Sequence, residues 1–210
     1  AEVVARYGED AYAAGLRVYS TVDSRLQRTA NDALRAGLVD YDRRHGWRGA
    51  ERHVQLAPGA GEDAWRAALD DVPVIGRMEP AVVVAVDDAQ ATVYAEGRGR
   101  IALPMARLAW ARRHVSADAR GPAPRKPADV VVSGDIVRIE RVPQQAPAPT
   151  NGAREPYGPP RHVWRLAQVP AVSGALVSIA ADDGAMLAMT GGFDFSLSKF
   201  NRALQARIAE

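Results

Sequence analysis

This sequence has no cysteine, almost no lysine and no long apolar run. Without cysteine, disulfide bonds and thiolate metal sites are excluded, which fits an oxidising and a reducing compartment equally well. The longest strongly apolar run, residues 81–86, is far shorter than the about 20 residues of a membrane-spanning helix. No secretory signal opens the chain. Because it starts inside what reads as a continuing element, we expect it to be cut from a longer protein.

What is present is typical of a globular chain. The 210 residues are 47% hydrophobic and 25% charged, which argues against disorder and leaves room for one good-sized domain or two small ones. The net charge is only +2, so the overall charge indicates no particular class of partner.

The N-terminal quarter predicts a strand followed by a helix. Residues 16–22 alternate between apolar and polar side chains, as in a half-buried strand. Ser24 and Gln27 form a capping-box pattern, Asp23 suits the positive end of a helix dipole, and Gly46 is a plausible helix end. The predicted helix carries one apolar stripe, formed by Leu26, Ala30, Ala33, Leu34, Gly37, Leu38 and Tyr41.

The middle of the chain is rich in short predicted strands. A short helix is expected over residues 62–71, packed through Trp65, Ala68 and Leu69. Strands are expected at residues 81–86, 91–95, 100–103, 130–140 and 163–169, with a short helix at 105–113. Five strands with a helix between the third and the fourth is the order of an OB fold, a small Greek-key barrel. We therefore predict a mainly β protein with an OB-like five-stranded barrel.

Loops and one hairpin complete the predicted organisation. Residues 116–127 and the proline-rich residues 143–161 are expected to be exposed loops. Near the C-terminus, apolar alternating runs at 175–180 and 185–190 flank Asp183-Gly184, which is a strong hairpin signal. Packing of the N-terminal helix stripe on this hairpin would give an α+β piece beside the barrel.

Ser196 and Lys199 form a Ser-x-x-Lys motif, the spacing of the nucleophile and its lysine in penicillin-interacting enzymes. That chemistry also needs a Ser-x-Asn and a Lys-Thr-Gly motif, and the chain contains neither. We interpret the motif as fortuitous. The histidines show no metal-ligand spacing, and the paired aspartates lie beside turns, so we predict no catalytic, cofactor-binding or metal-binding residues.

Basic residues are concentrated in the stretch from Arg98 to Lys126. On an OB barrel, such a stretch could bind single-stranded nucleic acid or an acidic partner. Nucleic-acid sites also stack bases on aromatic side chains, and the first two strands offer only Tyr94. Six residues are the candidates for partner binding: Arg98, Arg100, Arg112, Arg113, Arg125 and Lys126.

Several segments resemble the class A penicillin-binding proteins of the 1A type. Residues 15–27 are similar to the segment that opens the transpeptidase domain of that family, and residues 40–49 to its Tyr-Asp-x-Arg-His-Gly-Tyr-Arg-Gly stretch. Residues 174–192 resemble the return into the transpeptidase sheet. Residues 200–206, Phe-Asn-Arg-Ala-Leu-Gln-Ala, look like the segment just upstream of the catalytic Ser-x-x-Lys.

The resemblance implies three parts: residues 1–49 as an N-terminal piece of a transpeptidase domain, 50–170 as an inserted OB-like accessory domain, and 171–210 as a return that stops before the nucleophile. It implies a non-catalytic regulatory and interaction module from a bifunctional peptidoglycan glycosyltransferase and D-Ala-D-Ala transpeptidase. The parent would sit on the periplasmic face of the inner membrane by a single anchor, with a lipoprotein activator or peptidoglycan as partner and no cofactor. The alternative is an independent OB-fold module for single-stranded nucleic acid.

Overall fold

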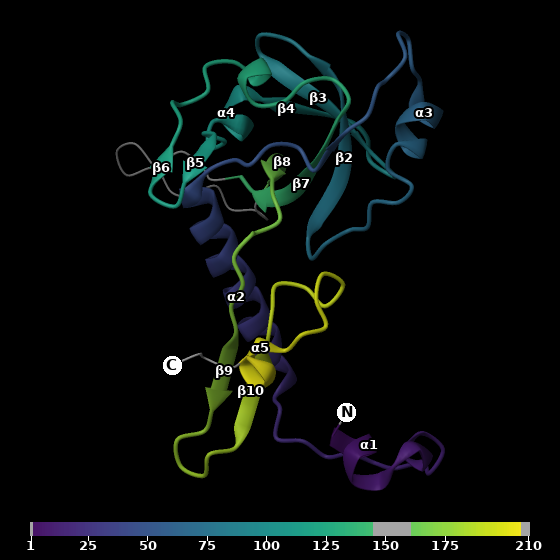
Figure 1. The fold of residues 1–210 in the computed structure, drawn as a ribbon, viewed down its shortest axis with the longest axis vertical. Coiled ribbons are helices and arrows are strands. Elements are labelled where there is room, and N and C mark those ends of the chain that lie inside the picture. The colour runs from purple at the N-terminus through teal and green to yellow at the C-terminus, as the bar shows by residue number, and fades with distance from the viewer. Residues whose placement is uncertain (1, 145–160, 207–210) are drawn as a thin grey trace.

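The computed structural model describes residues 2–144 and 161–206. A six-stranded antiparallel sheet forms one end of the molecule (Figure 1). A long helix, α2 (Ser24–His45), runs away from that sheet, and a two-stranded hairpin lies along it. The fold is therefore mainly β with a few helices, as the sequence predicted.

The large sheet contains all five predicted strands and one short addition. Its path is β1-β7-β2-β3-β4, and β8 pairs with the same β7. The strands are β1 (Arg52–His53), β2 (Met78–Val86), β3 (Gln90–Ala95), β4 (Gly99–Pro104), β7 (Asp135–Pro143) and β8 (His162–Ala167). Their alternate residues build two buried clusters, one around Val83, Val93 and Ile139 and the other around Val82, Tyr94 and Ile136.

The predicted closed five-stranded barrel is not confirmed, because the sheet stays open between β4 and β8. The helix α4 (Met105–Leu108) contacts both strands. Just after it, the indole N–H of Trp110 donates to the backbone oxygen of Leu166 in β8, at 3.1 Å. The Trp110 side chain thus forms a hydrogen bond with a backbone oxygen that a neighbouring strand would otherwise use. In the described part of the chain, no ladder of backbone hydrogen bonds joins β4 to β8.

Smaller elements cover the sheet. The predicted short helix is α3 (Glu62–Ala67), and its Trp65 is buried together with Leu69. Two elements were not predicted: the hairpin of β5 (His114–Ser116) and β6 (Ala119–Arg120) within the basic stretch, and the 3-10 turn η2 (Pro127–Asp129) just after it.

Helix α2 matches its prediction closely, with two corrections. Asp23, rather than Ser24, is the N-cap, and its carboxylate accepts hydrogen bonds from the backbone N–H groups of Arg25 and Leu26. The buried residues are Ala30, Leu38 and Asp42, while Tyr41 stays 43% exposed. A spacing of four residues, not a broad apolar stripe, therefore marks the inner face. At the end, Gly46 has φ 99°, and a side chain there would meet the backbone oxygen of Arg112.

The C-terminal hairpin is confirmed. It consists of β9 (Leu176–Ile179) and β10 (Met186–Thr190), which pair antiparallel. The amide of Gln27 in α2 donates to the oxygen of Met189 at 2.8 Å and accepts from its N–H at 3.0 Å, so one side chain acts like a neighbouring strand. Helix α2 packs on the hairpin here and on the sheet through Leu38, which joins Ile75 and Met78 in a third cluster.

The predicted strand at residues 16–22 is wrong. The chain there has no regular structure, and Leu16, Val18 and Tyr19 are exposed. An extended segment becomes a strand only when a second segment satisfies its backbone groups. This one instead makes isolated bonds to β10, such as Thr21 Oγ1 to the oxygen of Met186. The remaining elements are α1 (Glu2–Tyr7), η1 (Glu9–Tyr12) and α5 (Arg202–Gln205). None of the described helices has the length and apolarity to cross a bilayer.

Candidate functional site

The sheet is joined to the rest of the molecule at two chain crossings, and one buried carboxylate holds them together. The chain enters the sheet region after Gly46 and leaves it after Ala167. Asp42, 2% exposed near the end of α2, lies between these crossings. It accepts hydrogen bonds from three partners: Arg48 Nη2 at 2.7 Å, Gln168 Nε2 at 2.7 Å and the backbone N–H of Ala171 at 3.0 Å. We call this arrangement the Asp42 clamp.

The partners in the Asp42 clamp are themselves fixed. The amide of buried Gln168 also donates to the backbone oxygen of Gly46 and accepts from the N–H of Arg48. Arg48 donates in addition to the oxygen of Val169. Because most of these hydrogen bonds join one crossing to the other, the clamp fixes the direction in which the sheet leaves α2.

A second carboxylate, Asp194, ties the chain after the hairpin to the same junction. One of its oxygens accepts from the N–H of Gly76, at 3.0 Å, and from Arg35 in α2, at 3.1 Å. The other accepts from the N–H and the hydroxyl of Ser196. Burial tends to raise the pKa of Asp194, but the hydrogen bonds from Ser196 and the charge of Arg35 outweigh it, so the pKa lies below its ordinary value.

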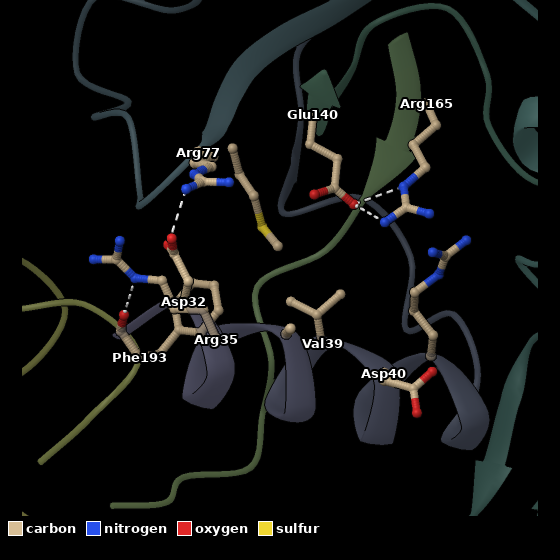
Figure 2. A pocket seen from close by; sticks show the side chains of 11 residues that line it. Asp32, Arg35, Val39, Asp40, Arg77, Glu140, Arg165 and Phe193 are labelled. Carbon is tan, nitrogen blue, oxygen red and sulfur yellow. Dashed lines mark hydrogen bonds and ion pairs between the residues drawn. The ribbon is translucent and has the colours of Figure 1, made fainter. Parts of the chain in front are cut away.

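Between these two ties lies a groove with a volume of about 340 Å³, shown in Figure 2. Helix α2 forms its floor with Asp32, Val39 and Asp40, and the other wall carries Arg77, Glu140 and Arg165. Most of its charges are paired. Arg77 reaches Asp32 at 2.9 Å, Arg165 reaches Glu140 at 2.7 Å, and Arg35 donates to the oxygen of Phe193. Because most of its charges are paired with one another, the groove is mainly a contact surface between α2 and the sheet.

The six predicted partner-binding residues are not brought to this junction, and they differ in their surroundings. Arg98 forms two hydrogen bonds with Glu79, and Arg100 lies over the ring of Trp65 at 4.6 Å. Arg112 donates to the oxygen of Gly121 at 2.8 Å. The other three, Arg113, Arg125 and Lys126, are exposed.

The nucleic-acid alternative finds no support in this geometry. Tyr94, the aromatic residue that the first two strands supply, is 3% exposed and packs with Trp65 in the core. A buried ring offers no face on which a base can stack.

Ser196 and Lys199 do not share a helix. Ser196 is in a turn, and its hydroxyl donates to Asp194 at 2.6 Å, while the amine of Lys199 lies over the ring of Phe195 at 5.9 Å. A nucleophilic serine needs a neighbouring base that accepts its proton. Here the partner of the hydroxyl is a carboxylate with a lowered pKa, already bound to Arg35 and Gly76.

Comparison with known proteins shows the family to which this chain belongs. The model of the penicillin-binding protein OB-like domain matches residues 47–172. This chain belongs to that family. It is 38% identical to Penicillin-binding protein 1A of Pseudomonas aeruginosa over 207 residues, which is 99% of this chain and 23% of that relative. With Penicillin-binding protein 1A of Escherichia coli the identity is also 38%, over 98% of this chain and 22% of the relative.

A solved structure agrees with the sequence matches. The crystal structure of Penicillin-Binding Protein 1A from Haemophilus influenzae superposes with a TM-score of 0.70 at 32% identity. The match covers 97% of this chain and 26% of that one. The chain thus spans about a quarter of the relatives it matches. The resemblance to penicillin-binding proteins of the 1A type is confirmed.

Sequence reasoning missed the junction of this penicillin-binding protein OB-like domain. Asp42 was not among the residues that the helical pattern singled out. A signal was present, because Asp42 continues the four-residue spacing of Ala30, Leu34 and Leu38. A carboxylate at a position where an apolar residue is expected indicates a buried and hydrogen-bonded group. Asp194 gave no comparable signal, since the partners that tie it to the junction, Arg35 and Gly76, lie far away in the sequence.

Proposed function

We propose that this chain is a non-catalytic regulatory and interaction module of a bifunctional peptidoglycan glycosyltransferase and transpeptidase. Its membership of the OB-like family and its identity to the 1A proteins support the parent class. The observation that carries the regulatory part is the Asp42 clamp. A partner that binds the sheet can act on α2 and the hairpin only if the connection between them is stiff, and the clamp supplies that stiffness.

The non-catalytic part rests on the surroundings of Ser196. Its hydroxyl is turned to Asp194, and Lys199 contacts an aromatic ring. The other motifs of penicillin chemistry are absent from the sequence. The parent would act on the periplasmic face of the inner membrane, held there by a single anchor. A lipoprotein activator or peptidoglycan is the proposed partner of the module, and residues 50–170 are its proposed limits.

Fluorescent penicillin tests the non-catalytic part directly. We expect the isolated 210-residue protein to remain unlabelled under conditions in which the complete Escherichia coli relative is labelled. Labelling of this chain that disappears in Ser196→Ala would show that Ser196 is a nucleophile and would refute this part of the proposal.

A hybrid protein tests the regulatory part. In this hybrid, the present chain replaces the matching segment of Escherichia coli Penicillin-binding protein 1A. Peptidoglycan synthesis is then measured for the hybrid, for its Asp42→Ala variant and for its Asp40→Ala variant, which is the matched control. Asp40 belongs to the same helix but only forms an exposed pair with Arg44 at 3.6 Å. We expect the activity of the hybrid to fall with Asp42→Ala alone. Equal activity of both variants, with the hybrid folded, would contradict a role of the clamp in coupling.

A further inference from the structure

A second cavity, of about 590 Å³, adjoins the groove and carries an unusual set of side chains. The two share Arg43 of α2 and Arg165 of β8. The second cavity adds Arg107 of α4 and Trp110, together with Ala106, Val142 and Pro143. Within the described residues its lining contains three arginines and no carboxylate. We call it the guanidinium cleft.

Two of the three guanidinium groups in this cleft have no carboxylate partner among the described residues. Arg165 is paired with Glu140, at 2.7 Å. Arg43 and Arg107 have no described carboxylate oxygen within 4.0 Å of their nitrogens. Burial lowers the pKa of Arg43 and the positive charge of Arg165 lowers it further, while the negative charges of Glu140 and Asp40 act in the opposite direction without outweighing them. An anion between these groups would relieve their repulsion.

The cleft also has a fixed aromatic wall. The guanidinium of Arg43 lies over the ring of Trp110, with its central carbon 4.7 Å from the ring centre. The indole N–H is bound to the oxygen of Leu166, and the ring meets Trp47 edge to face. Trp110 and Arg43 are therefore held in place before any ligand arrives, which reduces the entropy lost on binding.

We propose that the guanidinium cleft binds the carboxylates of an acidic peptide segment of a partner protein. Arginine forks match the two oxygens of a carboxylate. Val142, Pro143 and the free part of Trp110 form an apolar surface beside the charges, which suits an aliphatic side chain next to the carboxylate. An inorganic phosphate ion has no apolar part and would leave that apolar surface without a contact. None of the six basic residues predicted from the sequence lines the cleft.

The test uses the 210-residue protein and a fluorescein-labelled octapeptide of alternating glutamate and leucine. Binding is followed by fluorescence anisotropy. We expect Arg43→Gln and Arg107→Gln each to weaken binding about tenfold, as loss of a charge-assisted hydrogen bond does. Arg28→Gln is the matched control, because Arg28 lies on the same helix as Arg43 but is exposed outside the cleft, and we expect this variant to bind within about twofold of the unaltered protein. Rising salt should weaken binding.

Other outcomes overturn the proposal. It is wrong if the glutamate peptide does not bind, if a glutamine–leucine peptide binds equally well, or if Arg28→Gln has the same effect as Arg107→Gln. If inorganic phosphate binds as tightly as the peptide, the assignment to an acidic peptide is wrong. Thermal unfolding would reveal whether Arg43→Gln alters folding. Arg107 makes none of the described side-chain hydrogen bonds, so Arg107→Gln should leave the fold intact and keeps the test valid in that case.

Discussion

The sheet and the arm of this protein differ in how completely they bury their apolar side chains. We define the arm as α2, the β9–β10 hairpin and residues 191–206. In the sheet, strands β2, β3 and β7 bury most of their apolar residues, including Val82, Val93 and Ile139. In the arm, Ala188 is the hairpin's buried residue, while Ile179 and Phe195 are 60% and 72% exposed.

The comparison shows that the two regions gain stability in different ways. The sheet has its own core, so hydrophobic burial stabilises it. The arm is held to the sheet at single points, chiefly the Asp42 clamp, the bonds of Asp194 and the contact of Leu38 with Ile75 and Met78. We therefore expect substitutions in the sheet core to act through packing, and those at the junction to act through hydrogen bonds.

The largest expected effect is a cavity in the sheet. Ile139→Ala removes a fully buried side chain from β7 and should lower the free energy of unfolding by about 2–5 kcal/mol. Ile179→Ala is the matched substitution in β9 and should change it by less than about 0.5 kcal/mol. Urea denaturation measures both. Similar losses for the two variants would show that the arm is as well packed as the sheet.

The second largest expected effect is the loss of the Asp42 clamp. Asp42→Ala removes one acceptor each from the buried amide of Gln168 and the guanidinium of Arg48, so we expect a loss of about 2–3 kcal/mol in the same denaturation experiment. Asp40→Ala, two residues away on an exposed face of the same helix, should cost less than about 0.5 kcal/mol. A small effect of Asp42→Ala would mean that the crossings hold together without it.

The contrast between the sheet and the junction also shows which features of the fold could be predicted from the sequence. The succession of strands along the chain and the hairpin follow from local alternation and from turns such as Asp183-Gly184, and both were predicted. Whether β4 and β8 close a barrel depends on Trp110, which takes a backbone oxygen of β8, and no local pattern reveals that. The strand expected at 16–22 failed for the same reason: alternation shows a tendency, but a strand needs a partner.

The candidate site was harder to predict than the fold. Its groups lie far apart in the chain, as with Asp42 and Gln168 or Gly76 and Asp194. Charge density along the sequence drew attention to residues 98–126, whereas the guanidinium cleft takes only Arg107 from that stretch and combines it with Arg43 and Arg165 from two other elements. Proximity along the chain was therefore a poor guide to proximity in space.

The smallest expected effect concerns the second tie and depends on pH. Because the pKa of Asp194 is lowered in the folded protein, its contribution to stability is present above the ordinary aspartate pKa of about 3.9 and is lost as the pH falls through the lower, folded value. Asp194→Asn should cost about 1 kcal/mol at pH 7. In urea denaturation at several pH values, the gap between the two proteins should shrink as the pH falls below about 4. A gap that stays constant would show that the charge of Asp194 does not matter.

The distance between sheet and arm tests the central claim, that the Asp42 clamp joins them stiffly. The chain has no cysteine, so Arg28→Cys in α2 and Ala102→Cys in β4, both exposed, place two spin labels without competing thiols. Double electron–electron resonance then gives the distribution of distances between the labels. We predict one narrow distribution for the protein with the intact clamp and for Asp40→Ala, and a broad one for Asp42→Ala. A distribution that is already broad with the clamp intact, or that stays narrow in Asp42→Ala, would contradict the account.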